Sequence, residues 1–242
     1  MVAAAGINGG ATGVAPGCKI LAVKIFHADK LAQDERIADA IRYASLHADV
    51  LSCSWYGSLS NDVEMALVDS RELGRGGKGS VLVFASGNDS AAIRFPAYHA
   101  EALAIGASTD KAGFAAYSNF GPQQCVVGPS SGGVRGIFTT DDSTPNRGFN
   151  PGDVAKGGAD GLHTNNFSGT SAATPQVAGT AALMLSVNPK LDRDEVQSII
   201  QSTAEKIGPA TGYNANGHSS RFGYGRLNAA AAVSEAARQP TP

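Results

Sequence analysis

The stretch Asn166-Phe167-Ser168-Gly169-Thr170-Ser171-Ala172-Ala173-Thr174-Pro175-Gln176-Val177-Ala178-Gly179 joins a turn of small polar residues to the start of an apolar helix. The apolar pattern continues to Leu185. Because its residues are small and apolar all round, we predict a buried, central helix. Thr170 or Ser171 can cap this helix, and Pro175 is tolerated in or near the first turn. A hydroxyl at such a helix N-terminus lies in a positive field that favours a bound oxyanion.

Two interpretations of this serine are open from the residues alone. Ser171 is either part of an N-capping Ser/Thr cluster on a core helix or a nucleophile that the turn presents to a substrate. The nucleophile elbow of the α/β-hydrolases is excluded, because Ala173 stands where the pattern G-x-S-x-G requires its second glycine.

Apolar runs along the chain predict the fold. Residues 19–26, 49–54, 81–85 and 102–107 have strand character, and residues 34–48, 62–73 and 192–203 have helical spacing, as does a final alanine-rich segment that ends near Arg238. Near-continuous apolar strands separated by helices predict an α/β fold with a mostly parallel sheet covered on both faces. The glycine-rich region 128–165 is expected to form long loops around a short hairpin. We predict one domain, residues 1–238, with a tail or linker at 239–242.

Composition excludes several classes of partner. The formal net charge of -2 gives no reason to expect nucleic acid or an anionic membrane. No apolar run reaches the length of about 18 residues that a membrane-spanning helix needs, and the first residues lack the pattern of a signal peptide. Cys18, Cys53 and Cys125 are odd in number and lack metal-ligand spacing, so we expect buried free thiols.

Ligand sites of parallel sheets form at the carboxyl ends of the strands, here at Ser54-Trp55 and at Ser86-Gly87-Asn88. Acyl transfer by a serine needs a hydroxyl, a base, a group that orients the base, and donors for the oxyanion. Ser171 supplies the hydroxyl, and the Asn88 carboxamide is suited to donate to an oxyanion.

Gly169-Thr170-Ser171-Ala172-Ala173-Thr174-Pro175 resembles the nucleophile motif of the subtilisin-like serine proteases, the subtilases. Further stretches that match the family extend over nearly the whole chain, among them Phe95-Pro96-Ala97, Tyr117-Ser118-Asn119-Phe120-Gly121 and Gly223-Tyr224-Gly225. The resemblance implies a three-layer subtilisin-like fold that lacks the N-terminal strands, and a serine endopeptidase that acts on peptides or proteins.

The resemblance also implies roles for individual residues. Ser171 is the expected nucleophile and Asn88 the expected oxyanion donor; Ser54 and Trp55 would pair with the substrate backbone, and Ala85, Ser86 and Gly87 would form the wall of the specificity pocket. Tyr56 departs from the family, in which a glycine is usual. No cofactor is required, although structural calcium is common in the family, and Asp141 and Asp142 are candidate ligands. The family implies a secreted or extracellular protein.

The expected base and its orienting aspartate are missing from the matching positions. The family order is Asp, His, Ser, so both partners should precede Gly13, and we expect them upstream of Met1. The five histidines, His27, His47, His99, His163 and His218, lack the matching context. We therefore expect this chain to be inactive alone, with turnover reduced about a million-fold by the subtilisin benchmark.

The alternative is a non-catalytic module that binds extended peptides at Ser54-Trp55. Another serine hydrolase, with His218 as its base, is a third hypothesis.

A structural consequence follows from the same resemblance. In the family, the strand that carries the aspartate lies between the strands that resemble residues 19–26 and 49–54. Without that strand two apolar edges are unpaired. We expect an upstream segment or a second chain to complete the sheet, and otherwise poor folding or exchange of segments with a neighbour.

Overall fold

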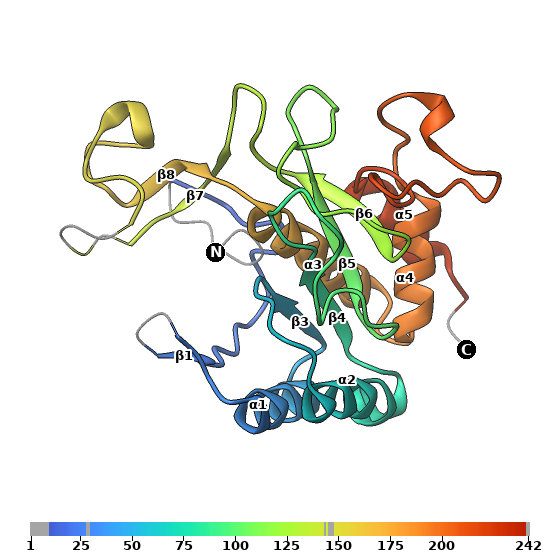
Figure 1. Ribbon diagram of the computed structural model, residues 1–242. Helices are drawn as coiled ribbons and strands as arrows, with labels where there is room; N and C mark the ends of the chain where they lie inside the picture. The colour runs from blue at the N-terminus through green and yellow to red at the C-terminus, as the bar shows by residue number, and fades with distance from the viewer. Residues whose placement is uncertain (1–9, 28–29, 143, 145–147, 241–242) are drawn as a thin grey trace.

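The computed structural model describes residues 10–27, 30–142, 144 and 148–240 (Figure 1). The strands are β1 (Phe26–His27), β2 (Lys30–Leu31), β3 (Val50–Cys53), β4 (Val81–Ala85), β5 (Leu103–Ser108), β6 (Gln124–Pro129), β7 (Ile137–Thr140) and β8 (His163–Phe167). The α-helices are α1 (Asp34–His47), α2 (Asn61–Leu73), α3 (Thr170–Val187), α4 (Arg193–Ser202) and α5 (Ala229–Arg238). Short 3-10 turns lie at Gly74–Gly77, Val154–Lys156 and Ala210–Gly212.

A parallel sheet of order β3-β4-β5-β6 forms the centre of the molecule. Side chains alternate along β4, so that Val81 and Val83 pack on one face among residues of α3, α4 and α5. Leu82 and Phe84 pack on the opposite face against α1 and α2. Figure 1 shows these three layers, which confirm the predicted α/β fold with helices on both faces.

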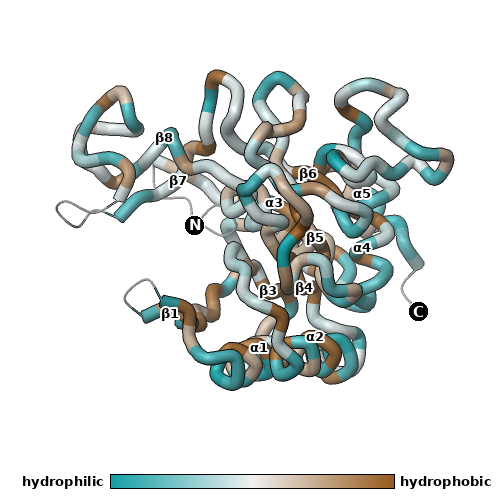
Figure 2. The backbone as a smooth tube through the Cα atoms, viewed as in Figure 1, coloured by the Kyte–Doolittle hydropathy of each residue, from teal (hydrophilic) through white to brown (hydrophobic). Residues whose placement is uncertain are grey.

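Helix α3 is the central helix that its sequence predicts. It contacts all four strands of the sheet and also α5. Its buried residues lie all around the helix and include Ala173, Val177, Ala181 and Met184. In Figure 2, hydrophobic residues are frequent along the strands of the sheet and recur along the helices beside it. Residues at both ends of α3 are therefore fixed relative to the sheet.

Most predicted elements coincide with observed ones to within two residues. Strands at 49–54, 81–85 and 102–107 correspond to β3, β4 and β5, and the predicted helices correspond to α1, α2, α4 and α5. Instead of the short hairpin expected within residues 128–165, the structure has the antiparallel pair β7-β8, whose second strand extends to Phe167 and whose strands are joined by a long loop. Strand β6 was not predicted, because only Cys125, Val126 and Val127 form an apolar run between Gln124 and Gly128.

The strand predicted at residues 19–26 is wrong. Only Phe26–His27 forms a strand there, paired antiparallel with Lys30–Leu31, and residues 19–24 are exposed. An apolar run becomes a strand only when another strand supplies hydrogen bonds along it, and no strand among the described residues lies beside this segment.

The predicted domain, residues 1–238, and tail, 239–242, extend beyond the described residues and stay predictions. No described helix is both long and apolar enough to cross a membrane.

Gly128 on β6 tests how closely α3 packs on the sheet. A Cβ atom there would lie 2.9 Å from the carbonyl oxygen and 3.0 Å from the Cβ of Ala173. We expect Gly128→Ala to lower the free energy of unfolding by about 1–3 kcal/mol, because helix or strand must shift. The control is Gly17→Ala, whose Cβ meets nothing within 4 Å and whose cost should stay within about 0.5 kcal/mol. Equal urea midpoints for the two variants would contradict this packing.

The buried thiols give a second prediction. Cys53 and Cys125 are buried and free, and burial raises the pKa of each thiol to about 12. Since unfolded thiols ionise near pH 8.5, the stability that they contribute is present below that pH and is lost as the pH rises toward 12. At pH 8.5, iodoacetamide should modify the half-buried Cys18 in the native chain, and all three cysteines after denaturation. Rapid native modification of Cys125, detected by mass spectrometry, would refute the prediction.

Candidate active site

The N-terminus of α3 begins at a sharp glycine turn. Gly169 is the N-cap residue and has φ 80°, a left-handed conformation that glycine adopts without strain. A Cβ atom there would also lie 3.2 Å from Nδ2 of Asn88. Thr170 and Ser171 are the first two helical residues. The prediction that one of their side chains caps the helix is therefore wrong, and a residue from another segment satisfies the first free amide.

That residue is Asn88, which follows the carboxyl end of β4. Its Oδ1 accepts a hydrogen bond of 2.8 Å from the amide of Thr170 and another of 3.0 Å from the Thr170 hydroxyl. The same hydroxyl accepts from the amide of Gly87 at 3.3 Å. Two donors on Oδ1 fix the orientation of the carboxamide. Nδ2 donates to no other group in the described part of the chain, and Asn88 is exposed. The carboxamide N–H groups thus face solvent at the end of the helix that carries Ser171.

Ser54 joins a second strand end to the same turn. Proline lacks an amide hydrogen, so Pro175 leaves the carbonyl of Ser171, four residues earlier, without its helical partner. The hydroxyl of Ser54, which directly follows β3, donates to this carbonyl at 3.2 Å. Pro175 lies in the second turn of α3, close to the first turn as predicted, but it does remove a helical hydrogen bond, and Ser54 replaces that bond.

The neighbouring Trp55 anchors its segment to the core. It is half-buried, and its ring packs edge-on against Phe84 at a centroid distance of 5.4 Å. Ala85, Ser86 and Gly87 are buried and have small side chains or none. A ligand beside residues 85–87 would therefore contact mainly their backbone. The structure therefore gathers Ser54, Trp55, residues 85–87 and Asn88 around the start of α3.

Asn119 is a positioning residue whose role sequence analysis missed. It is fully buried, and its Oδ1 accepts from the amides of Asp89 at 2.8 Å and Ala91 at 3.1 Å. Its Nδ2 donates to the carbonyl of Ser86 at 3.1 Å. A side chain at Gly87, where φ is 109°, would meet this amide at 2.3 Å. One buried carboxamide therefore fixes the loop that presents Asn88.

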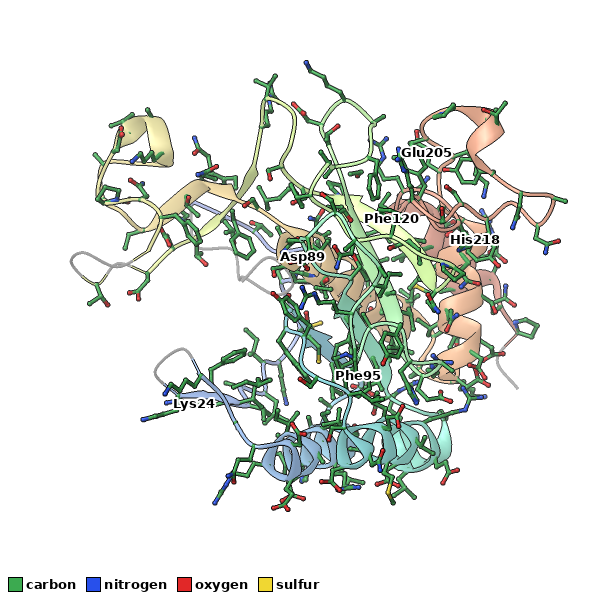
Figure 3. All side chains as sticks on the ribbon, viewed as in Figure 1. Lys24, Asp89, Phe95, Phe120, Glu205 and His218 are labelled. Carbon is green, nitrogen blue, oxygen red and sulfur yellow. The ribbon has the colours of Figure 1, made fainter. Side chains whose placement is uncertain are left out.

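The Ser171 side chain makes no hydrogen bond to a histidine or a carboxylate in the described residues. His218 bonds the carbonyl of Gln124 at 2.8 Å, at the amino end of β6, whereas Ser171 lies near the carboxyl ends of β3 and β4. Figure 3 shows His218 well separated from Asp89, the residue next to Asn88. His218 is thus excluded as the base. The other histidine contacts are His47 with Tyr43, His99 with Glu101 and His163 with Phe138.

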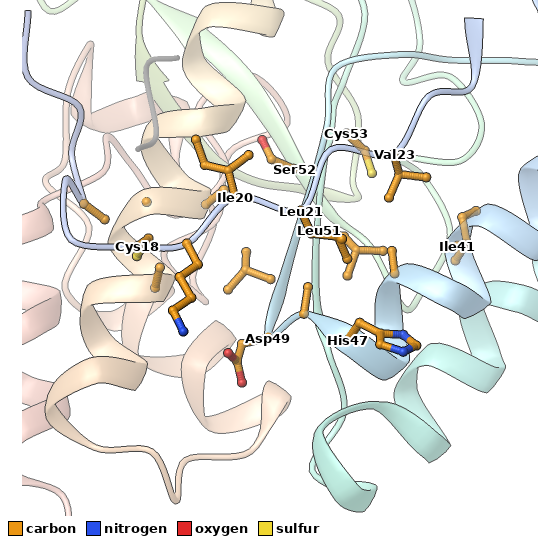
Figure 4. Close-up of a pocket in the computed structure, with 18 of the residues that line it drawn as sticks. Cys18, Ile20, Leu21, Val23, Ile41, His47, Asp49, Leu51, Ser52 and Cys53 are labelled. Atoms are coloured by element: carbon orange, nitrogen blue, oxygen red, sulfur yellow. The ribbon is translucent and has the colours of Figure 1, made fainter. Parts of the chain in front are cut away.

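A cavity of about 1060 Å³ lies between residues 18–26 and β3, bounded by α1 and α3 (Figure 4). Apolar side chains dominate its walls, and Ile20, Leu21 and Val23 are 58%, 41% and 37% exposed. In the described part of the chain, β3 pairs only with β4. The cavity thus exposes one hydrogen-bonding edge of the central sheet.

Asp141 and Asp142 do not form a calcium cage in the described residues. The Asp141 carboxylate accepts from the amides of Asp142 at 2.9 Å, Phe149 at 2.7 Å and Asn150 at 2.7 Å. Within the described part of the chain, no group of three or more His, Cys, Asp or Glu side chains could hold a metal ion. These bonds stabilise the loop and use the oxygens that an ion would need.

Comparison with known proteins identifies the family. The sequence profile described as the Subtilase family matches residues 1–225. This chain belongs to the subtilase family. A calcium-dependent protease of Trichormus variabilis is 40% identical over 261 residues, which cover 97% of this chain but 39% of that protein. Subtilisin BL of Lederbergia lenta is 30% identical over 228 residues, covering 93% of this chain and 71% of its own sequence.

Solved structures of proteases share the fold of this subtilase. A protease from Pseudoalteromonas arctica superposes with a TM-score of 0.77 and 26% identity, covering 97% of this chain and 68% of the other. The patellamide maturation protease superposes with a TM-score of 0.69 and 26% identity, covering 93% and 77%. The chain spans about two fifths of the length of the first curated relative, 39%.

Thr170 connects the loop after β4 to the start of α3. This connection can be tested by substitution. Thr170→Val keeps the shape of the side chain but removes the hydroxyl that bonds Gly87 and Asn88. We expect a loss of about 1–3 kcal/mol in the free energy of unfolding, because buried polar groups lose their partner. Thr174→Val, in the same helix, is the matched control, since it loses one bond to the Thr170 carbonyl. If guanidinium denaturation shows Thr170→Val to be the milder variant, the link is not a structural constraint.

Proposed function

We propose that this subtilase chain carries the nucleophile and oxyanion site of a serine endopeptidase. The observation that carries the proposal is the orientation of Asn88. Its Oδ1 is held by Thr170, which leaves Nδ2 as the donor beside Ser171. An oxyanion donor must be fixed before the reaction. A donor that is already oriented stabilises the developing negative charge without a free-energy cost for its own reorientation.

The described residues support the following chemistry. An extended substrate pairs its backbone with Ser54 and Trp55, and a side chain enters the pocket walled by residues 85–87. The Ser171 hydroxyl attacks the peptide carbonyl carbon and loses its proton to a base. Asn88 Nδ2 and the Ser171 amide stabilise the oxyanion of the tetrahedral intermediate. The amine leaves with a proton, and water then releases the acyl group from Ser171.

The base and its orienting carboxylate, in this proposal, belong to a segment outside the described residues, either of the natural protein or of a second chain. The cavity between residues 18–26 and β3 supports this, because it offers an apolar slot along the free edge of a strand. A strand in that slot would end beside Ser54, which bonds the Ser171 carbonyl. The greater length of the curated relatives also fits a protein with further segments. Without that segment, the chain is expected to retain only residual activity.

The alternative function is a non-catalytic module that binds extended peptides at the Ser54-Trp55 segment. It is favoured by one observation, the lack of a base next to Ser171 among the described residues. In that case Ser171 would be a structural residue of the α3 turn, and the chain would bind peptides without forming an acyl intermediate.

Calcium and location stay secondary parts of the proposal. Two relatives are named calcium-dependent proteases, but Asp141 and Asp142 do not fit as a cage, so no step of the mechanism passes through a metal. Secretion is proposed from the family alone. The proposed partners are peptide or protein substrates.

Labelling with a fluorophosphonate separates the two functions. We expect the full natural protein to be labelled rapidly at Ser171, and residues 1–242 about a million-fold more slowly, the loss seen when subtilisin lacks its histidine. Ser171→Ala should abolish labelling, whereas Ser168→Ala, in the same turn, should not. Asn88→Leu should slow labelling about a hundred- to a thousand-fold, again by the subtilisin benchmark. Peptide binding without labelling of the full protein would favour the binding module.

A further inference from the structure

Three side chains meet beside the loop that carries Asn88. The Arg94 guanidinium carbon lies 4.6 Å from the centre of the Tyr56 ring. Arg94 Nε also donates to Asp89 Oδ2 at 2.8 Å. Tyr56 follows Trp55 of the proposed substrate segment, and Asp89 follows Asn88. The cluster therefore bridges the two segments between which a bound peptide would lie.

Backbone hydrogen bonds fix this cluster relative to the pocket wall. The amide of Arg94 donates to the carbonyl of Ser86 at 3.2 Å, and the amide of Gly57 donates to the carbonyl of Phe95 at 3.0 Å. Ser86 is buried in the middle of the wall that residues 85–87 form. Because the backbone of Arg94 is bonded to this residue, Arg94 is held beside the segment 85–87 instead of on a free loop.

The guanidinium still has donors to offer. Only its Nε is hydrogen-bonded in the described part of the chain, so both terminal nitrogens are free to donate, and the side chain is 46% exposed. Two parallel N–H groups of one guanidinium match the two oxygens of a carboxylate. The Tyr56 ring and Asp89 hold the plane of the Arg94 guanidinium in place. Less conformational entropy is therefore lost when a carboxylate binds to it.

We propose that Arg94 is a specificity-determining residue that selects an acidic side chain of the bound peptide, Asp or Glu, at the pocket walled by residues 85–87. This inference rests on the proposed peptide site at Ser54-Trp55 and names the substrate class of that site. Tyr56 and Asp89 position the guanidinium and do not touch the substrate carboxylate.

A basic side chain fits the cluster less well. Asp89 Oδ2 already accepts from Arg94 Nε and from Asn119 Nδ2, at 3.4 Å. A peptide lysine would compete for this carboxylate and meet the positive charge of Arg94. An acidic side chain, in contrast, binds the terminal nitrogens without breaking the Arg94–Asp89 pair. That pair does not cancel the attraction, because both of its side chains are partly exposed and an exposed ion pair is weak.

The test compares two dye-labelled peptides that differ by one charge. Fluorescein-Ala-Ala-Pro-Glu-amide and its Gln counterpart, labelled at the N-terminus, are titrated by fluorescence anisotropy against the chain with Ser171→Ala, so that cleavage cannot interfere. We expect the Glu peptide to bind about five- to tenfold more tightly at low salt, the range of a charge-assisted pair at a partly exposed site. The ratio should shrink at high salt.

Substitutions assign the effect to Arg94. Arg94→Gln should bring the ratio of the two dissociation constants to about one, and Arg94→Lys should keep part of the preference. Arg238→Gln is the matched control, because it removes the same charge from another exposed ion pair, with Glu235 on α5, and should leave the ratio unchanged. A ratio of one in the parent chain, a ratio that survives Arg94→Gln, or failure of both peptides to bind would overturn the proposal.

The outcome is separable from the peptidase chemistry. A Glu preference that depends on Arg94, together with a Ser171 that a fluorophosphonate does not label in the full protein, would support this inference and reject the proposed catalysis. Labelling of Ser171 with equal affinity for both peptides would reject the inference and leave the catalysis in place.

Discussion

The two hydrogen bonds from Thr170 to Asn88 Oδ1 are the constraint on which the site depends. They attach the loop after β4 to the first residue of α3, and α3 in turn contacts every strand of the parallel sheet. The position of Ser171 is thus set by the same packing that forms the core. Gly169 makes the junction feasible, because a Cβ atom there would crowd Asn88. The orientation of Asn88, the proposed oxyanion donor, is consequently a property of the fold and needs no ligand.

Pro175 shows how a residue that weakens a helix can strengthen a site. Proline in the second turn removes the partner of the Ser171 carbonyl, and Ser54 occupies the vacant acceptor from the end of β3. The start of α3 is therefore bonded to two strand ends, one through Asn88 and one through Ser54. Asn119 adds a third connection, since it holds the loop of Asn88 from the segment between β5 and β6.

Sequence patterns predicted those elements whose structure depends mainly on their own residues. Runs such as residues 81–85 are apolar enough to be strands in any parallel sheet, and the motif around Ser171 predicted the subtilase family and the buried helix α3. Residues 19–26 have an equally good pattern, yet they form no central strand, because pairing depends on a neighbour that the local sequence does not specify. The roles of Asn119 and Arg94 were not predicted for the same reason. A buried carboxamide and a guanidinium acquire meaning only from groups 30 or 38 positions away, Asp89 for Asn119 and Tyr56 for Arg94.

The cavity beside β3 separates two requirements of the proposed catalysis, the fixed oxyanion donors and the base that activates Ser171. The proposed oxyanion side of the site is fixed by α3, β4 and Asn119, all of which pack into the core of the described structure. In the proposed function, the carboxylate that orients the base must arrive with a strand that occupies the cavity, and the base belongs to the same segment. Pairing that strand with β3 would cover apolar side chains that are now exposed, and so would stabilise the fold and supply the catalytic group in one step. Stability and activity should accordingly rise together when the cavity is filled, whereas substitutions at the Asn88 junction affect the site even when it is empty.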